Sequence, residues 1–213
     1  MTLINNISYF DSKALLDDYL FKKIEQLGSL NTHTNIILSG GTSPVALYKR
    51  MGDSFLSLKQ FRFVLSDDRR VKIDDALSNE GMLHRTLGKA ADFHLLSLHS
   101  DDIEMQLQSI PYYDLAILGM GLDGHFASIF PDMTNLESAL SSKHSIEFVN
   151  DGYPEVPRIT MTLNEINKAK EIILLIHGQE KLDLLLNLDT NSNLPIKYLL
   201  TTTHQKILIA TYV

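Results

Sequence analysis

The chain has 213 residues, enough for one large domain, and we expect a single domain spanning residues 1–213. Because it contains no cysteine, disulfides, zinc–thiolate sites and thiol nucleophiles are excluded. The formal net charge is −7, from 19 Lys and Arg against 26 Asp and Glu. This acidity argues against nucleic acid as the main partner, because contact with a phosphate backbone needs a basic surface.

The N-terminal residues lack the basic start and the apolar core of a signal peptide. No apolar run approaches the roughly 20 residues that span a bilayer. We therefore expect a cytoplasmic protein that has no membrane contact. The sequence leaves open whether the protein is a monomer or a weak dimer.

Apolar segments suited to strands alternate along the chain with amphipathic segments suited to helices. In chain order, the sequence predicts strands at residues 35–39, 61–65, 93–98, 113–118, 145–149, 171–176 and 206–212. It predicts helices at 11–27, 44–51, 79–87, 102–109, 164–169 and 179–188, and a short helix at 126–130. Several strands are unbroken runs of Ile, Leu and Val, which is typical of a sheet covered on both faces. The pattern predicts a doubly wound, Rossmann-like α/β fold, with a mostly parallel sheet and helices on both faces.

Polar clusters directly follow three of the predicted strands. They are Ser39-Gly40-Gly41-Thr42-Ser43, Ser66-Asp67-Asp68-Arg69-Arg70 and Gly119-Met120-Gly121-Leu122-Asp123-Gly124-His125. In open α/β sheets, ligands bind outside the carboxyl ends of the strands. The sequence therefore predicts one binding site, formed by the three clusters at one edge of the sheet.

The first cluster is suited to hold a phosphate group. Gly40 and Gly41 let the backbone turn tightly, and Thr42 or Ser43 can cap the helix that Pro44 starts. Free amides at the start of that helix would bind an anion. An ordinary turn between a strand and a helix would have the same composition. The cluster is neither a Walker A loop nor a dinucleotide-binding fingerprint, because the required Lys or third Gly is missing.

The other two clusters contain a candidate base and a candidate cation. His125 lies on a turn bounded by glycines, close to Asp123, where it can accept a proton from water. Arg69 could hold a phosphate or a developing oxyanion, although a solvated run of charges is the commoner explanation for its segment. Lys181, near the start of the helix after strand 171–176, is a second candidate phosphate contact.

Two common classes of hydrolase are not supported by the sequence. It contains no Gly-x-Ser-x-Gly elbow, which a serine hydrolase of the α/β type would have. The histidines form no His-Glu-x-x-His pattern and show no convincing ligand spacing, so no metal site is expected.

Taken together, these segments resemble the 6-phosphogluconolactonase family, within the larger group that includes glucosamine-6-phosphate deaminases. The matching segments are residues 38–44, 66–71 with Ser78-Asn79, 119–131, 157–163 and 178–181. The segment 119–131 is the most specific, and all segments occur in the same order as in the family. The resemblance implies hydrolysis of 6-phospho-D-glucono-1,5-lactone to 6-phosphogluconate, in the oxidative pentose phosphate pathway.

The resemblance also implies roles for individual residues. The implied catalytic residues are His125, as the general base, with Asp123, Arg69 and Asp67 lining the reacting end. The implied phosphate contacts are Ser39, Gly40, Gly41, Thr42, Ser43, Lys181 and Arg158. The family usually has Asp-Glu-Arg where this chain has Asp67-Asp68-Arg69, which leaves the role of Asp68 open. Because a δ-lactone is already an activated ester, no cofactor, metal or covalent intermediate is expected.

Two other functions remain as alternatives. A deaminase of the larger group would share the glycine-rich loop and the Asp-Gly-His turn. It would typically continue that turn as His-Ile-Ala-Phe-Asn-Glu and carry Tyr in place of Arg69. This chain instead reads His125-Phe126-Ala127-Ser128-Ile129-Phe130-Pro131, which favours the lactonase. A non-catalytic protein that binds sugar phosphates would keep the fold, but the presence of Asp123, His125 and Arg69 argues against it.

Overall fold

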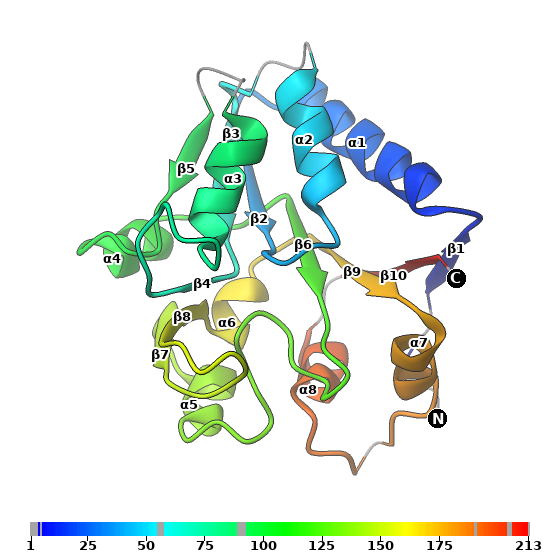
Figure 1. The fold of residues 1–213 in the computed structure, drawn as a ribbon, viewed down its shortest axis with the longest axis vertical. Coiled ribbons are helices and arrows are strands. Elements are labelled where there is room, and N and C mark those ends of the chain that lie inside the picture. The colour runs from blue at the N-terminus through cyan, green and yellow to red at the C-terminus, as the bar shows by residue number, and fades with distance from the viewer. Residues whose placement is uncertain are drawn as a thin grey trace.

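The computed structural model describes residues 4, 6–54, 58–88, 93–189, 191–203 and 206–212. Its main sheet has seven strands in the order β1-β10-β9-β6-β2-β3-β5, and each neighbouring pair is parallel. The strands are β1 (Ile7–Phe10), β2 (Thr34–Leu38), β3 (Phe61–Leu65), β5 (His94–Leu96), β6 (Leu115–Gly119), β9 (Glu171–His177) and β10 (Lys206–Tyr212). The first and last strands lie together at one edge of the sheet (Figure 1). The predicted α/β class with a parallel sheet is confirmed.

Helices cover both faces of this sheet. They are α1 (Lys13–Leu30), α2 (Val45–Asp53), α3 (Asn79–Leu87), α4 (Ile103–Gln108), α5 (Leu136–Ser141), α6 (Leu163–Ile166), α7 (Gln179–Leu186) and α8 (Pro195–Thr202). Helices α1, α2 and α3 lie on one side, and α6, α7 and α8 on the other (Figure 1). Successive residues of a strand point to opposite faces, and Ile36, Ile37 and Leu38 of β2 are all fully buried. The unbroken apolar runs therefore form a core on each face of the sheet.

A second, antiparallel sheet has the order β4-β8-β7, with β4 (Asp67–Arg69), β7 (Ile146–Val149) and β8 (Arg158–Met161). Residues 145–149 were predicted to belong to the parallel sheet, so that part of the prediction is wrong. The segment that begins at Asp67 is not a solvated run of charges, because Asp67 and Asp68 are buried. Strand β4 continues directly from β3 and thus connects the small sheet to the large one.

The predicted short helix at residues 126–130 is wrong. The segment forms a tight turn in which the amide of Ile129 donates to the carbonyl of Phe126, at 3.0 Å, and the two residues form an isolated bridge. Ala127 adopts a positive φ of 49°, in the left-handed region, which a helix does not allow. The other predicted helices are present, with ends that differ by at most three residues, and the ends of α3 match the prediction. Strands β1, β4 and β8 and helices α5 and α8 were not predicted.

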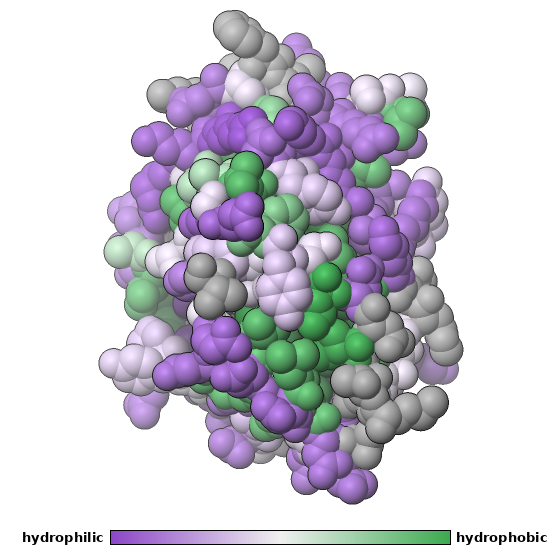
Figure 2. Space-filling model, turned by 90° about the vertical axis from the view of Figure 1, so that its right-hand side faces the viewer, coloured by the Kyte–Doolittle hydropathy of each residue, from purple (hydrophilic) through white to green (hydrophobic). Residues whose placement is uncertain are grey.

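The face of the molecule near the β1 edge is mixed in character. Polar side chains cover its upper part, and apolar side chains gather below the middle (Figure 2). The elements on that side include β1, α1 and α7, which carry the exposed apolar side chains of Tyr9, Leu15 and Leu186. Among the described helices, none has the length and apolarity needed to cross a membrane.

Helices α2 and α3 come into close contact at Gly52, near the end of α2. A Cβ at this position would stand 2.3 Å from the backbone oxygen of Thr86 and 3.0 Å from Cα of Leu87. We expect Gly52→Ala to lower the free energy of unfolding by about 1–3 kcal/mol, as overpacking typically does. A lower midpoint in urea denaturation would show this loss.

The matched control is Gly119→Ala, because a Cβ on Gly119 would have no heavy atom within 4 Å. Its midpoint should stay at the wild-type value. Equal midpoints for the two variants would contradict the close α2–α3 contact.

Candidate active site

A cavity of about 310 Å³ lies at the carboxyl ends of β2, β3 and β6. The connections run in opposite directions across the sheet from β2 to β3 and from β6 to β9, so the cavity lies at a topological switch point. The predicted phosphate contacts Ser39, Gly40, Gly41, Thr42, Ser43, Lys181 and Arg158 all line it. The predicted catalytic residues Asp67, Arg69 and His125 line it as well. The predicted convergence of the three polar clusters is thus present in the structure.

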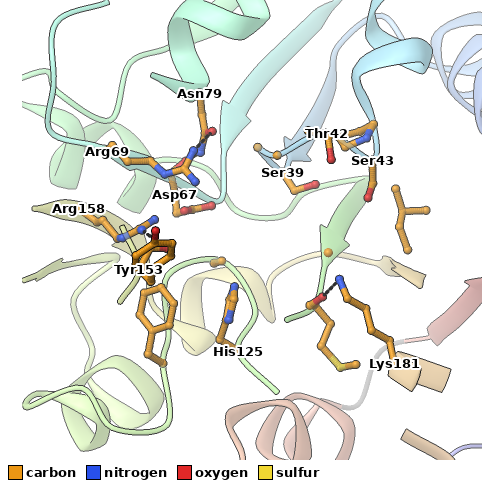
Figure 3. Close-up of a pocket in the computed structure, with 18 residues that line it drawn as sticks. Ser39, Thr42, Ser43, Asp67, Arg69, Asn79, His125, Tyr153, Arg158 and Lys181 are labelled. Atoms are coloured by element: carbon orange, nitrogen blue, oxygen red, sulfur yellow. Dashed lines mark hydrogen bonds between the residues drawn. The ribbon is translucent and has the colours of Figure 1, made fainter. Parts of the chain in front are cut away.

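The loop from Ser39 to Ser43, here the 39–43 loop, forms one wall of the cavity. Gly41 adopts a φ of +79°, which favours glycine, and the carbonyl of Ser39 accepts a hydrogen bond from the buried Tyr48 hydroxyl at 2.9 Å. The side-chain oxygens of Ser39, Thr42 and Ser43 point toward the cavity (Figure 3). The buried Ser39 hydroxyl has no hydrogen-bond partner within the described part of the chain.

The predicted cap of α2 by Thr42 or Ser43 is wrong. Pro44 occupies the N-cap position, in a helical conformation, and no described side chain caps the helix. The amide of Val45 donates to the carbonyl of Thr42 at 3.4 Å, whereas no described hydroxyl of the 39–43 loop caps α2. These hydroxyls and the next amides of the helix can therefore serve an anion.

Lys181 lies on the same side of the cavity as this loop (Figure 3). It belongs to the first turn of α7, and its Nζ donates to the carbonyl of Met120 at 2.6 Å. An ammonium group has three donors, so this bond leaves two for a ligand. The 39–43 loop and Lys181 together offer hydroxyls, backbone amides and one positive charge.

His125 lies between the two sides of the cavity and is held by Asp123. Its Nδ1 is 2.6 Å from Oδ1 of Asp123, which also accepts the backbone amide of His125 at 3.2 Å. Because an ionised carboxylate only accepts, this contact favours the proton on Nδ1 and leaves the Nε2 lone pair free to take a proton. A Cβ on Gly121 would lie 2.3 Å from the imidazole, so a glycine is needed there. Asp123 itself is not among the described residues that line the cavity.

Asp67 is buried at the start of β4, with both carboxylate oxygens bonded to hydroxyls. The Oγ of Ser66 donates to Oδ1 at 3.1 Å, and the Oγ of Ser128 donates to Oδ2 at 2.6 Å. Ser128 follows His125 by three residues, so this bond connects the His125 turn to β4. The carboxylate is therefore held in a fixed position at the cavity wall.

Arg69 and Arg158 face each other across the β4–β8 pair, on the opposite side of the cavity from Lys181 (Figure 3). Nη1 of Arg69 donates to Oδ1 of Asn79 at 2.6 Å, and Nη2 of Arg158 donates to the carbonyls of Tyr153 and Pro154, both at 3.1 Å. Both buried Nε atoms have no partner within the described residues. Burial, and next the charge of Arg69, lower the pKa of Arg158. Two neighbouring guanidiniums on paired strands favour an anion between or beside them.

Asp68 points away from the cavity and holds the backbone around it. Its Oδ1 accepts the amides of Arg69 at 2.7 Å and Asn79 at 2.6 Å, and its Oδ2 accepts the amide of Glu80 at 3.0 Å. The same Oδ2 lies 3.2 Å from Nε2 of His99, and this hydrogen bond raises the pKa of His99. The structure thus gives Asp68 a role that the sequence left open.

Asp68, Glu80 and His99 each bring one possible metal ligand within 4.8 Å of the others. The two oxygens of Asp68 already serve the four donors just described, and the Oε2 of Glu80 accepts from Ser97 at 2.6 Å. These contacts account for the cluster as a structural network.

Four residues at the site had no predicted role, although the matching segments contain three of them, Asn79, Ser128 and Phe130. Asn79 lines the cavity and Ser128 supports Asp67. The ring of Phe130 packs against His125, with centroids 4.6 Å apart, and Tyr153 lies at the cavity with most of its surface exposed. Asn79 and Ser128 are polar residues inside the matching segments, which was the signal available in the sequence; their burial is seen only in the structure.

Known proteins are similar to this chain in sequence over most of its length. A 6-phosphogluconolactonase of Thermotoga maritima is 30% identical over 186 residues, covering 81% of this chain and 82% of the relative. One from Caulobacter vibrioides is 32% identical over 186 residues, covering 80% of each.

Solved structures show the same fold over almost the whole chain. The 6-phosphogluconolactonase from Shewanella baltica has a TM-score of 0.88 at 24% identity, covering 99% of this chain and 98% of that chain. The one from Thermotoga maritima has a TM-score of 0.83 at 26% identity, covering 98% and 99%. A family model described as glucosamine-6-phosphate isomerases/6-phosphogluconolactonase matches residues 12–209. The chain therefore belongs to the glucosamine-6-phosphate isomerase/6-phosphogluconolactonase family.

Proposed function

We propose that this protein hydrolyses 6-phospho-D-glucono-1,5-lactone to 6-phosphogluconate, with His125 as the general base. The observation that carries this proposal is the Asp123-supported imidazole of His125, placed between two cationic sides of one cavity. The relatives named 6-phosphogluconolactonase support the same activity. Arg69, where deaminases of the larger group typically have Tyr, favours the lactonase over that alternative.

The two sides of the cavity suit the two ends of the substrate. The phosphate on C6 would bind the 39–43 loop and Lys181, by helix amides, hydroxyls and a charge-assisted hydrogen bond. The C1 carbonyl would then face Arg69 and His125. The phosphate contact expected for Arg158 does not fit this binding mode, because Arg158 lies beside Arg69, across the cavity from Lys181.

In the proposed reaction, Nε2 of His125 removes a proton from water as the water oxygen attacks C1. The carbonyl oxygen becomes an oxyanion, which the guanidinium of Arg69 stabilises. When the carbonyl re-forms, the bond from C1 to the ring oxygen breaks, and that oxygen leaves on C5 and takes up the proton held by the imidazolium of His125, which returns to its neutral form. Asp123 stabilises the imidazolium formed in the first step. The fixed carboxylate of Asp67 is proposed to line this reacting end.

The cellular location, the number of domains and the class of substrate are proposed from the sequence. We propose a cytoplasmic enzyme of one domain that acts on a small sugar phosphate. The acidic net charge of −7 supports a substrate other than nucleic acid. The oligomeric state stays as the sequence left it, a monomer or a weak dimer.

The direct test is hydrolysis of freshly made 6-phosphogluconolactone by the purified protein, with glucosamine-6-phosphate as the control substrate. We expect lactone opening well above the spontaneous rate, unchanged by EDTA, and no ammonia from the control. His125→Ala should lower kcat by about 10²–10⁴, the usual contribution of a positioned base. Ammonia release without lactone opening would favour the deaminase, and a wild-type kcat in His125→Ala would show that the base is elsewhere.

Lys181→Ala tests how the phosphate is bound. Loss of a charge-assisted hydrogen bond costs roughly 1.5–3 kcal/mol, so KM for the phosphorylated lactone should rise about ten- to a hundredfold. Hydrolysis of unphosphorylated gluconolactone should change little, because it lacks the group that Lys181 contacts. Equal effects on both substrates would mean that Lys181 does not bind phosphate.

A further inference from the structure

Asn79 stands where three segments of the cavity wall meet. It is the first residue of α3, and its side chain is almost completely buried. Its Oδ1 accepts from Nη1 of Arg69 at 2.6 Å, and its Nδ2 donates to the carbonyl of Asp67 at 2.9 Å. A Cβ on Gly40 would stand 2.1–2.2 Å from the end of the Asn79 side chain, so the amide packs directly on the 39–43 loop.

The orientation of this amide is determined by its two partners. The oxygen faces a guanidinium, which only donates, and the nitrogen faces a carbonyl, which only accepts. The reversed amide would place two donors together at Arg69 and two acceptors together at Asp67. The side chain therefore has one favourable orientation, and in it Oδ1 is directed at Arg69.

The backbone of Asn79 is fixed as firmly as its side chain. Oδ1 of the fully buried Asp68 accepts the amides of both Asn79 and Arg69, and Oδ2 accepts the next amide of α3. Asn79 and Arg69 are thus joined twice, once by their backbones through Asp68 and once by their side chains. This closed set of contacts sets the distance between α3 and β4 at the cavity.

The contacts matter most for Arg69, whose side chain is long and has many rotamers. Nη1 is held by Asn79 and by the carbonyl of Leu77 at 3.2 Å, while its buried Nε has no partner within the described residues. A donor that is already in place when charge develops on the substrate stabilises a transition state best. Asn79 holds the guanidinium of Arg69 in place in advance, and it does so without needing to touch the substrate.

We propose that Asn79, anchored by Asp68, is a positioning residue that holds the guanidinium of Arg69 where it stabilises the oxyanion. The inference rests on the proposed function, from which it takes the role of Arg69. It assigns a role to Asn79 and to Asp68 beyond the general base and the phosphate contacts.

The test is a double-mutant cycle on hydrolysis of 6-phosphogluconolactone, with Asn79→Ala, Arg69→Ala and the double variant. Arg69→Ala should lower kcat by about 10²–10³, as loss of an oxyanion donor does. Asn79→Ala should lower kcat by roughly tenfold or more and change KM by less than about threefold, because the charge on Arg69 would remain but its position would be lost. In the Arg69→Ala background, Asn79→Ala should cost less than about twofold, since the two groups act together.

Ser78→Ala is the matched control for the stability of α3. The Ser78 hydroxyl caps the same helix at the amide of Gly81, at 2.9 Å, and takes no part in the contacts of Arg69. It should lower Tm by about 2–4 °C and change kcat by less than about twofold in either background. If Asn79→Ala does not fold, the cycle is run with Asn79→Ser, which also removes the amide.

The proposed function and this inference fail in different ways. One contradicting result is that Asn79→Ala lowers kcat by the same factor in the wild-type and the Arg69→Ala backgrounds. The other is that Asn79→Ala leaves kcat at the wild-type value although Arg69→Ala lowers it. Either result would show that Asn79 does not act through Arg69. The positioning role is then wrong and the proposed function stands. If Arg69→Ala hydrolyses at the wild-type rate, the role of Arg69 in the proposed function is wrong, and the positioning role with it.

Discussion

The parallel pairing of β6, β2 and β3 is the constraint on which the site depends. Parallel strands end at the same edge of a sheet, so the segments after these three strands must lie near one another. Those segments carry the 39–43 loop, the Asp67 to Arg69 strand and the His125 turn. Their connections diverge beyond the edge, which leaves the cavity between them. The apolar core on both faces of the sheet thus maintains the geometry of the polar site.

Charge is distributed very differently inside the cavity and over the whole chain. The chain is acidic, with a net charge of −7, yet Lys181, Arg69 and Arg158 all line the cavity. The buried carboxylates nearby, Asp67 and Asp68, are occupied by hydroxyls, backbone amides and His99. They hold the framework in place, so the cations remain available to an anionic substrate. Net charge alone would not have indicated this.

The sequence predicted those parts of the fold in which the local pattern and the structure agree. The unbroken apolar runs of the central strands marked them clearly, and the polar clusters at their ends marked the site. Strands β4 and β8 lacked such a signal, because Asp67, Asp68 and Arg158 are charged residues that only the folded protein shows to be buried. The turn at Ala127 was predicted as a helix because nothing in its composition indicates a positive φ.

The same reasoning explains which site residues were found. His125, Arg69 and Lys181 belong to residue types and positions with obvious chemistry, so they were predicted. Asn79 acts through contacts between α3, β4 and the 39–43 loop, which are distant in sequence and cannot be derived from spacing. Asp123 was expected to line the reacting end, but the structure places it against Nδ1 of His125, outside the described lining of the cavity.

The central claim is that the substrate lies across the cavity, with its phosphate at one side and its C1 at the other. A crystal structure of the protein with 6-phosphogluconate tests it most directly. We predict hydrogen bonds from the phosphate to the 39–43 loop and to Nζ of Lys181, with the C1 carboxylate beside Arg69 and His125. A phosphate beside His125, with the carboxylate at Lys181, would contradict the account, and so would product bound outside this cavity.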